Sequence, residues 1–183
     1  FKIDKILPII EHGHIDFGEN KVQEALEKWT EIKKKNLKIK LHMIGKLQTN
    51  KVKFAVKLFD YIHSVDSQKL AKKIAEEQLK LDKRVKIFLQ VNIGDESQKS
   101  GIKKNDLDKL VYYCKEIKLD LIGLMCIPPA NIDPEYYFKE MQQLNKNYGF
   151  KELSMGMSSD YIQAAKNLST YLRIGSSIFG QRF

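Results

Sequence analysis

Two short segments near the end of the chain combine glycine and hydroxyl residues in a way that suits a phosphate group. Met157-Ser158-Ser159-Asp160 and Gly175-Ser176-Ser177 each stand just before an expected helix. The first amides of a helix lack partners inside the helix, and together with the helix dipole they attract phosphate. The two segments therefore predict a phosphate site, although plain helix capping uses the same residue types and stays an alternative.

Arg173 is a second candidate for chemistry, because arginine is rare in this chain. Only three of the 32 basic residues are arginines, and Arg173 lies near the end of an expected buried strand. A charge in such a place needs a partner or a ligand. The sequence predicts that Arg173 meets either a ligand or an acidic group inside the fold.

Metal and hydrolytic chemistry find little support in the sequence. The histidines His12, His14, His42 and His63 do not share a metal-ligand spacing on one element. No Gly-x-Ser-x-Gly elbow is present, and no carboxylate has an evident partner for glycoside hydrolysis. We therefore expect no metal site and assign no catalytic residue.

The elements that must position these residues follow from the spacing of apolar side chains. Ile3, Ile6, Leu7 and Ile10 recur at helical spacing, whereas residues 85–93 form the clearest strand. The two periods alternate along the whole chain, which predicts parallel strands joined by helices. The expected strands span residues 14–17, 39–44, 61–65, 85–93, 121–127, 153–157 and 171–175.

Two α/β architectures fit seven strands that follow an opening helix. A (β/α)8 barrel of the TIM type needs eight strands to close, so this chain would be such a barrel without its first strand. An open doubly wound sheet would need no eighth strand. We favour the barrel, and we expect residues 1–183 to form a single domain because no linker or repeat interrupts them.

Composition limits the classes of protein. With 43% hydrophobic and 30% charged residues, the chain is expected to be soluble and globular. It has no apolar run of about 20 residues that would cross a membrane. The net charge of +9 comes mostly from lysines on polar helix faces, whereas a nucleic-acid groove would use more arginine. We therefore expect no nucleic-acid partner, and nucleic-acid binding is a weaker alternative. Two unrelated cysteines favour a reducing, cytoplasmic setting.

Five segments of the chain carry motifs in a fixed order. Residues 17–24 read F-G-E-N-K-V-Q-E, and residues 42–51 read H-M-I-G-K-L-Q-T-N-K. The remaining three are S-Q-K-S-G at 97–101, L-S-M-G-M-S-S-D at 153–160 and R-I-G-S-S-I-F-G at 173–180. Over essentially its whole length the chain resembles the YggS/PROSC family, the pyridoxal 5′-phosphate (PLP) homeostasis proteins.

The resemblance implies a TIM barrel like the N-terminal domain of alanine racemase, with PLP as its cofactor. By resemblance, the cofactor phosphate would lie on the amides and hydroxyls of Ser158, Gly175 and Ser176. Arg173 would approach the pyridine nitrogen. The ring pocket would be lined by Asn20, His42 and Met43.

The resemblance also implies a non-catalytic carrier or buffer that serves vitamin B6 and amino-acid homeostasis. A guanidinium beside the pyridine nitrogen keeps that nitrogen unprotonated, which weakens the ring as an electron sink. The alternative is a PLP-dependent, racemase-like enzyme, but racemization needs a second acid or base on the opposite face of the ring. Alanine racemase takes that group from a second domain, which we do not expect here. The implied partners are PLP and PLP-dependent apo-enzymes, and we expect a monomer without membrane contact.

One part of the family pattern falls outside this sequence. In the family, the Schiff-base lysine ends the first strand, in a segment like A-V-S-K-T just before the helix that opens this chain. The sequence begins at Phe1, after that point. We therefore expect a chain truncated before its first strand, in which no lysine takes the role by position.

Overall fold

The computed structural model describes residues 1–130 and 132–181. Within them, seven parallel strands form one sheet in which each strand pairs with the next along the chain. The sheet therefore has β1 at one edge and β7 at the other. The strands are β1 (Asp16–Glu19), β2 (Lys40–Met43), β3 (Tyr61–Val65), β4 (Lys86–Val91), β5 (Asp120–Cys126), β6 (Glu152–Met157) and β7 (Tyr171–Arg173).

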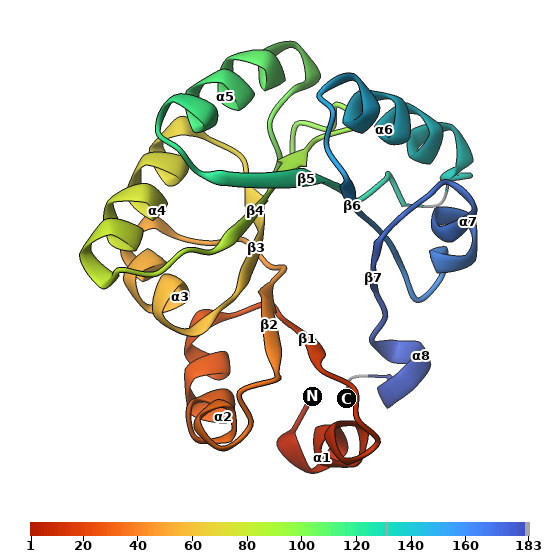
Figure 1. Cartoon of the computed structure of the whole chain (residues 1–183). Coiled ribbons are helices and arrows are strands. Elements are labelled where there is room, and N and C mark those ends of the chain that lie inside the picture. Colours follow the sequence, from red (N-terminus) through yellow and green to blue (C-terminus); the bar gives the residue numbers. More distant parts are fainter. Residues whose placement is uncertain (131, 182–183) are drawn as a thin grey trace.

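Helices alternate with the strands and cover the outer face of the curved sheet (Figure 1). Each amphipathic helix turns its apolar face to the sheet, which is why the periods of 3.6 and 2 alternate in the sequence. The helices are α1 (Ile3–Glu11), α2 (Val22–Lys35), α3 (Val52–Leu58), α4 (Gln68–Leu81), α5 (Lys104–Glu116), α6 (Glu135–Asn147), α7 (Tyr161–Lys166) and α8 (Ser176–Phe179), with a 3-10 turn η1 (Thr49–Lys51).

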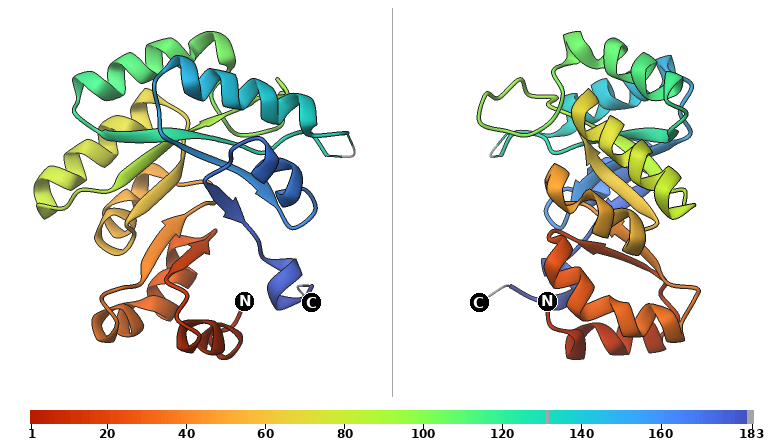
Figure 2. Two further views of the ribbon diagram at one scale, coloured as in Figure 1. Left: turned by 45° about the vertical axis from the view of Figure 1, so that its right-hand side comes forward. Right: turned by 90° about the vertical axis from the view of Figure 1, so that its left-hand side faces the viewer.

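The sheet curls into a nearly closed barrel of the TIM type, so the prediction of a barrel is confirmed against the open sheet (Figures 1 and 2). No pairing joins β1 to β7 among the described residues. Beside this opening, α1 and α8 come together. The rings of Phe1 and Phe179 lie 4.7 Å apart, and Lys5 Nζ donates a hydrogen bond to the Phe179 carbonyl at 3.3 Å.

The boundaries of the two edge strands differ from the prediction. The first strand begins at Asp16, two residues later than expected, since its pairing starts with Asp16 opposite Lys40. The last strand ends at Arg173, two residues early, because Gly175 already caps α8. Both shifts lie at the opening of the barrel, where a strand has a neighbour on one side only.

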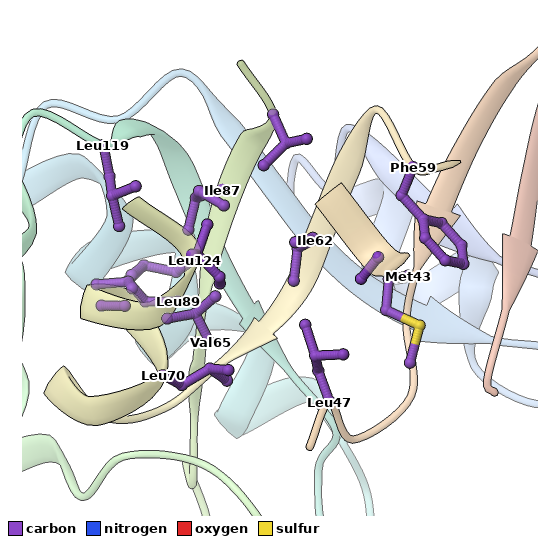
Figure 3. Packing of buried hydrophobic residues seen from close by; sticks show 14 of the residues in the cluster. Met43, Leu47, Phe59, Ile62, Val65, Leu70, Ile87, Leu89, Leu119 and Leu124 are labelled. Atoms are coloured by element: carbon purple, nitrogen blue, oxygen red, sulfur yellow. The ribbon is translucent and has the colours of Figure 1, made fainter. Parts of the chain in front are cut away.

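The main core lies between the outer face of the sheet and the helices. Figure 3 shows part of it, with Ile62, Ile87 and Leu124 packed beside one another. The largest fully buried side chains of this cluster are aromatic: Trp29, Phe59 and Phe138. At about 25 cal/mol for each Å² of apolar surface removed from water, this layer is the main source of stability.

The interior of the barrel is a separate and more polar layer. Phe88 and Met125 are fully buried there but are not part of the outer cluster. Successive residues of a strand point to opposite faces of the sheet. His42, His63 and Ser154 therefore point inward, whereas their strand neighbours join the outer core.

Candidate functional site

A cavity of about 500 Å³ lies at the opening between β1 and β7. Its apolar side is formed by α1 and α8, through residues such as Ile6 and Phe179. Its polar side is formed by strands, and the polar and aromatic lining residues of that side include Asp16, Asn20, His42, His63, Tyr171 and Arg173. A concave, largely apolar site with a few polar groups is typical of a small-molecule site.

Two glycines allow the backbone approaches that shape this site. A Cβ at Gly45 would lie 2.2 Å from the Asn20 carbonyl oxygen, so only glycine lets the segment after β2 pack against Asn20. Gly156 has a φ of +90°, and a Cβ there would lie 2.5 Å from the Cβ of Ala164. Glycine at this place lets β6 turn toward Ser158 while α7 packs closely against it.

Arg173 lies half-buried on the polar wall of the cavity. Its Nη1 donates to Ser154 Oγ at 2.8 Å, and its Nη2 donates to the carbonyl of Cys126 at 2.8 Å. Burial lowers the pKa of the guanidinium, which still stays charged at neutral pH. The salt bridges recorded among the described residues do not include Arg173. Both hydrogen-bond acceptors of Arg173 are neutral. Of the two predicted alternatives, a ligand or an acidic group inside the fold, the structure therefore shows no acidic hydrogen-bond partner among the described residues.

Four hydrogen bonds connect Arg173 to the opposite edge of the sheet, through five residues that we call the barrel network. Arg173 Nη1 bonds to Ser154 Oγ at 2.8 Å, and Ser154 Oγ bonds to His63 Nδ1 at 2.9 Å. His63 Nε2 then meets His42 Nδ1 at 3.0 Å, and His42 Nε2 meets Asp16 Oδ1 at 3.0 Å. The barrel network therefore joins β7, β6, β3, β2 and β1 across the barrel interior.

The two histidines of the barrel network are held in their neutral form. Burial lowers the pKa of His42, and the hydrogen bond that its ring makes to the Asp16 carboxylate opposes that shift. The pKa of His63 is held well below its usual value by burial first, then by His42 and Arg173. Close by, burial and then a hydrogen bond with Tyr61 raise the pKa of Tyr171, which keeps that phenol neutral as well.

The two segments that predicted a phosphate site lie side by side. Ser158 Oγ accepts hydrogen bonds from the amides of Gly175 and Ser177, at 3.1 and 3.3 Å, and Ser177 Oγ donates to the Ser158 carbonyl at 3.3 Å. Two amides at the start of α8 thus converge on one oxygen. Asp160 is the N-cap residue of α7, as the capping alternative expects, but its Oδ1 accepts from the Met157 amide and not from an amide of the helix. Ser158 Oγ instead accepts from amides at the start of α8.

The structure brings most of the predicted binding residues to one place. Asn20, His42, Arg173 and Gly175 line the cavity. Ser158 is hydrogen-bonded to Gly175 beside it, and Ser176 is the exposed first residue of α8. Met43 is placed differently: it is almost fully buried in the outer core (Figure 3), on the face of β2 opposite to His42.

Besides His63, the site holds further residues to which the sequence assigned no role. Asp16, Ser154 and Tyr171 are each separated by one residue from another polar or glycine residue on the same strand. Inward-facing polar residues within otherwise apolar strands are the signal that marks them. The sequence does not show which strands they face, so their contacts with the histidines were not predictable.

Residues 1–130 and 132–181 were expected to hold neither a metal site nor a membrane span. No group of three or more histidine, cysteine, aspartate or glutamate side chains is placed to hold a metal ion there. None of the helices in these ranges has both the length and the apolar character that a bilayer span requires.

Comparison with known proteins identifies the family. The family model for the alanine racemase N-terminal domain matches residues 2–182. The chain belongs to this family. It is 37% identical to the pyridoxal phosphate homeostasis protein of Aquifex aeolicus (strain VF5) over 176 residues, which cover 91% of this chain and 76% of that protein. It is 34% identical to the protein of the same name from Escherichia coli (strain K12) over 187 residues, with 97% and 80% covered. The resemblance to pyridoxal phosphate homeostasis proteins is thereby confirmed.

Solved structures agree with this family membership. PipY of Synechococcus elongatus PCC7942 with PLP bound has a TM-score of 0.87 and 33% identity, and the match covers 98% of this chain and 88% of PipY. Alanine racemase of Clostridium difficile 630 has a TM-score of 0.75 at 15% identity, covering 97% of this chain and 48% of the racemase. At that identity the racemase is evidence for the fold alone.

Proposed function

We propose that this protein binds PLP in the cavity between β1 and β7 and serves PLP and amino-acid homeostasis as a carrier or buffer. The observation that carries the proposal is the polar wall of the cavity. On this wall the guanidinium of Arg173 has no acidic hydrogen-bond partner, and two backbone amides point at one oxygen atom. The homeostasis proteins named above and the PLP-bound PipY support it.

The amides at the start of α8 fit a phosphate group. In the structure the amides of Gly175 and Ser177 both point at one hydroxyl oxygen, Ser158 Oγ. The Ser158 oxygen accepts hydrogen bonds from these amides, and the hydroxyl hydrogen of Ser158 can be donated to a phosphate oxygen, since a serine hydroxyl does both. We propose that Ser158, Gly175 and Ser176 hold the phosphate.

Arg173 fits the nitrogen of a pyridine ring. When bound, PLP supplies an electrophilic aldehyde and an electron-withdrawing ring. A permanently charged guanidinium donates a hydrogen bond to the nitrogen and keeps a proton off it. We propose that Asn20 and His42 complete the ring pocket. The contribution of Met43 would be indirect, through the packing of the outer face of β2.

The open edges of β1 and β7 fit an eighth parallel strand. Both edges present backbone groups that a neighbouring strand would pair, and a TIM barrel closes with eight strands. We propose that the protein is a single barrel domain whose first strand pairs with β1 and β7 and carries the lysine that binds the aldehyde. PLP-dependent apo-enzymes would be the recipients of the cofactor, and the protein would act as a cytoplasmic monomer.

We propose a non-catalytic role, which the proposed contact of Arg173 with the pyridine nitrogen supports. The Arg173 cation disfavours a protonated pyridine nitrogen, which is the form that best withdraws electrons from a substrate. Exchange of the α-proton of amino acids in deuterated water tests this directly. PLP-dependent exchange at the rate of a racemase would favour the racemase-like alternative over the carrier.

PLP binding is tested with two forms of the protein, the 183 residues and a form extended before Phe1 by a strand that ends in an A-V-S-K-T segment. Each is titrated with PLP by absorbance, reduced with borohydride and analysed by mass spectrometry. We expect an adduct on one upstream lysine in the extended form alone, and weaker, non-covalent binding in the short form. Variant Arg173→Met is expected to weaken both, whereas Arg84→Met is the control, since Arg84 bonds the Lys118 carbonyl on the surface. Absence of specific binding in both forms would refute the proposal.

A further inference from the structure

The barrel network contains one feature that PLP binding alone does not explain. Buried polar side chains cost free energy unless each is hydrogen-bonded. Here Ser154 is fully buried, and His42 and His63 are almost fully buried. All three lie in one line of hydrogen bonds that runs from Asp16 to Arg173.

The chemistry of the two ends fixes the direction of every hydrogen bond in that line. A carboxylate only accepts and a guanidinium only donates. Because Asp16 accepts, His42 carries its hydrogen on Nε2 and accepts on Nδ1. His63 must then donate from Nε2 and accept on Nδ1, so the Ser154 hydroxyl donates to His63 and its oxygen is left to accept from Arg173. One neutral tautomer of each ring satisfies all four bonds.

One aromatic ring stacks on each histidine, and the hydrogen bonds given for the two rings among the described residues all lie within the barrel network. His42 stacks on Tyr61 with ring centroids 4.2 Å apart, and His63 stacks on Phe88 at 4.2 Å. Tyr171 meets His63 edge to face at 5.8 Å. Since the ring faces are covered, the orientation of His63 is set by its two ring nitrogens.

We propose that His63 is a positioning residue for Arg173. His63 takes the hydroxyl hydrogen of Ser154, which turns a lone pair of Ser154 Oγ toward Arg173 Nη1. His42 and Asp16 hold His63 in the tautomer that does this. The importance of this positioning for cofactor binding rests on the proposed function, because a guanidinium that is already fixed does not have to change its conformation when the PLP ring binds. The positioning itself belongs to the protein alone and is testable without any ligand.

The tautomers are measured first, by correlating the imidazole nitrogens and hydrogens in 15N NMR spectra of the ligand-free protein. The chain has four histidines, so single substitutions to glutamine assign every signal. We expect His42 and His63 each as one Nε2–H tautomer, beside mixtures of tautomers for the exposed His12 and His14. A hydrogen on Nδ1 of His63, or a mixture there, would overturn the proposal without any variant having to fold.

The guanidinium is measured second, through the Nη–H signals of Arg173, which is one of three arginines. We expect separate, slowly exchanging Nη–H signals in the native protein and merged, averaged signals in His63→Leu and Ser154→Ala. Phe88→Leu is the matched control, since it removes the ring stacked on His63 and keeps every bond of the network; its Arg173 signals should stay separate. Averaging in Phe88→Leu to the same extent would show that packing, and not the hydrogen bonds, holds Arg173.

A third experiment separates this inference from the proposed function. Pyridoxine 5′-phosphate, which has the ring but no aldehyde, and inorganic phosphate are titrated into the native protein and into His63→Leu. We expect the variant to bind pyridoxine 5′-phosphate ~10-fold more weakly and phosphate equally well. An equal loss for both ligands would contradict a role at the ring. If the native protein binds neither ligand, the proposed function fails, while the two NMR measurements still decide the positioning of Arg173.

Discussion

The middle of the sheet and its two edges are built in different ways. In the middle, β4 pairs with β5 through six residue pairs, and five of the six residues of β4 are buried. At the edge, β7 has three residues, none of them fully buried, and pairs with β6 at two positions. The middle buries apolar side chains between strands and helices, whereas the edges place polar groups around a cavity.

This difference separates the source of stability from the site. The apolar core around β3, β4 and β5 needs no polar partner and depends on close packing. The polar wall near β1 and β7 depends on its hydrogen bonds and buries less apolar surface. A substitution in the middle should therefore change the free energy of unfolding, while one at the edges should change binding.

The largest expected effect is on stability, in the apolar core between the sheet and the helices. Phe59 is fully buried in the outer core (Figure 3), and Phe59→Ala should lower the free energy of unfolding by about 3–5 kcal/mol because it leaves a cavity. Urea denaturation measures this, with Phe54→Ala as control since Phe54 is 44% exposed. The folded variant should bind pyridoxine 5′-phosphate like the native protein. If Phe59→Ala and Phe54→Ala lowered the free energy of unfolding equally, the contrast between the apolar core and the polar edges would be contradicted.

The next effect is on binding, at the edge. Arg173→Met should weaken binding of pyridoxine 5′-phosphate by roughly 10- to 100-fold, since a hydrogen bond from a charged group contributes about 1.5–3 kcal/mol. Its effect on the urea midpoint should be smaller than that of Phe59→Ala. Isothermal titration calorimetry gives the affinity, and Arg84→Met, which loses a surface bond to the Lys118 carbonyl, should bind normally. Equal affinities of the two arginine variants would contradict a role for Arg173.

The histidines of the barrel network predict how stability changes with pH. Folding lowers the pKa of His42 and His63, so the unfolded chain binds more protons below about pH 6.5. Stability is complete above that pH and falls as the pH decreases, by up to about 1.4 kcal/mol per pH unit for each histidine. The charges that act on them are Asp16, Asp60 and Lys33 at His42, and Arg173 at His63.

Urea midpoints between pH 7 and pH 5 measure this slope. His63→Leu should flatten it by the share of one histidine, while Phe54→Ala, which replaces an exposed side chain that does not titrate, should leave it unchanged. A steeper slope in His63→Leu, or no difference between the two variants, would mean that His63 is not held neutral by folding.

The smallest expected effect lies at the phosphate segments. Ser158→Ala removes the oxygen that accepts the Gly175 and Ser177 amides, and it should weaken phosphate binding by roughly 2- to 10-fold, as expected for a neutral hydrogen bond of about 0.5–1.5 kcal/mol. Ser159→Ala, one residue along and exposed, is the control. Competition with pyridoxine 5′-phosphate measures both. Stronger phosphate binding by Ser158→Ala would show that Ser158 competes with the ligand and does not hold it.

The sequence predicted the fold well because the apolar periods state which face of each element is buried. The strand at β4 and the alternation of helices with strands required no knowledge of distant contacts. Arg173 and the Ser158 and Gly175 segments were predicted too, since rare or conformationally special residue types mark them. The boundaries were predicted less well than the elements themselves, both at the edges, in β1 and β7, and in the middle, where β4 ends at Val91, two residues before the predicted end.

The barrel network was not predictable from the sequence. Its members come from five strands and span positions 16 to 173, so they meet only because of the strand order and the curvature of the sheet. Met43 illustrates the same limit at close range. It was grouped with His42 in the ring pocket, yet neighbours on a strand point to opposite faces, and Met43 packs against the helices.

The position of bound PLP in a crystal structure of this protein is the most direct test of the central claim. We expect the phosphate within hydrogen-bond distance of Ser158, Gly175 and Ser176, and the pyridine nitrogen facing the guanidinium of Arg173. The contrary result would be PLP bound elsewhere with the β1–β7 cavity empty. One other place for it is the cleft at the ends of α4 and α5, which Lys83, Arg84 and Lys118 line together with Asp82 and Glu116.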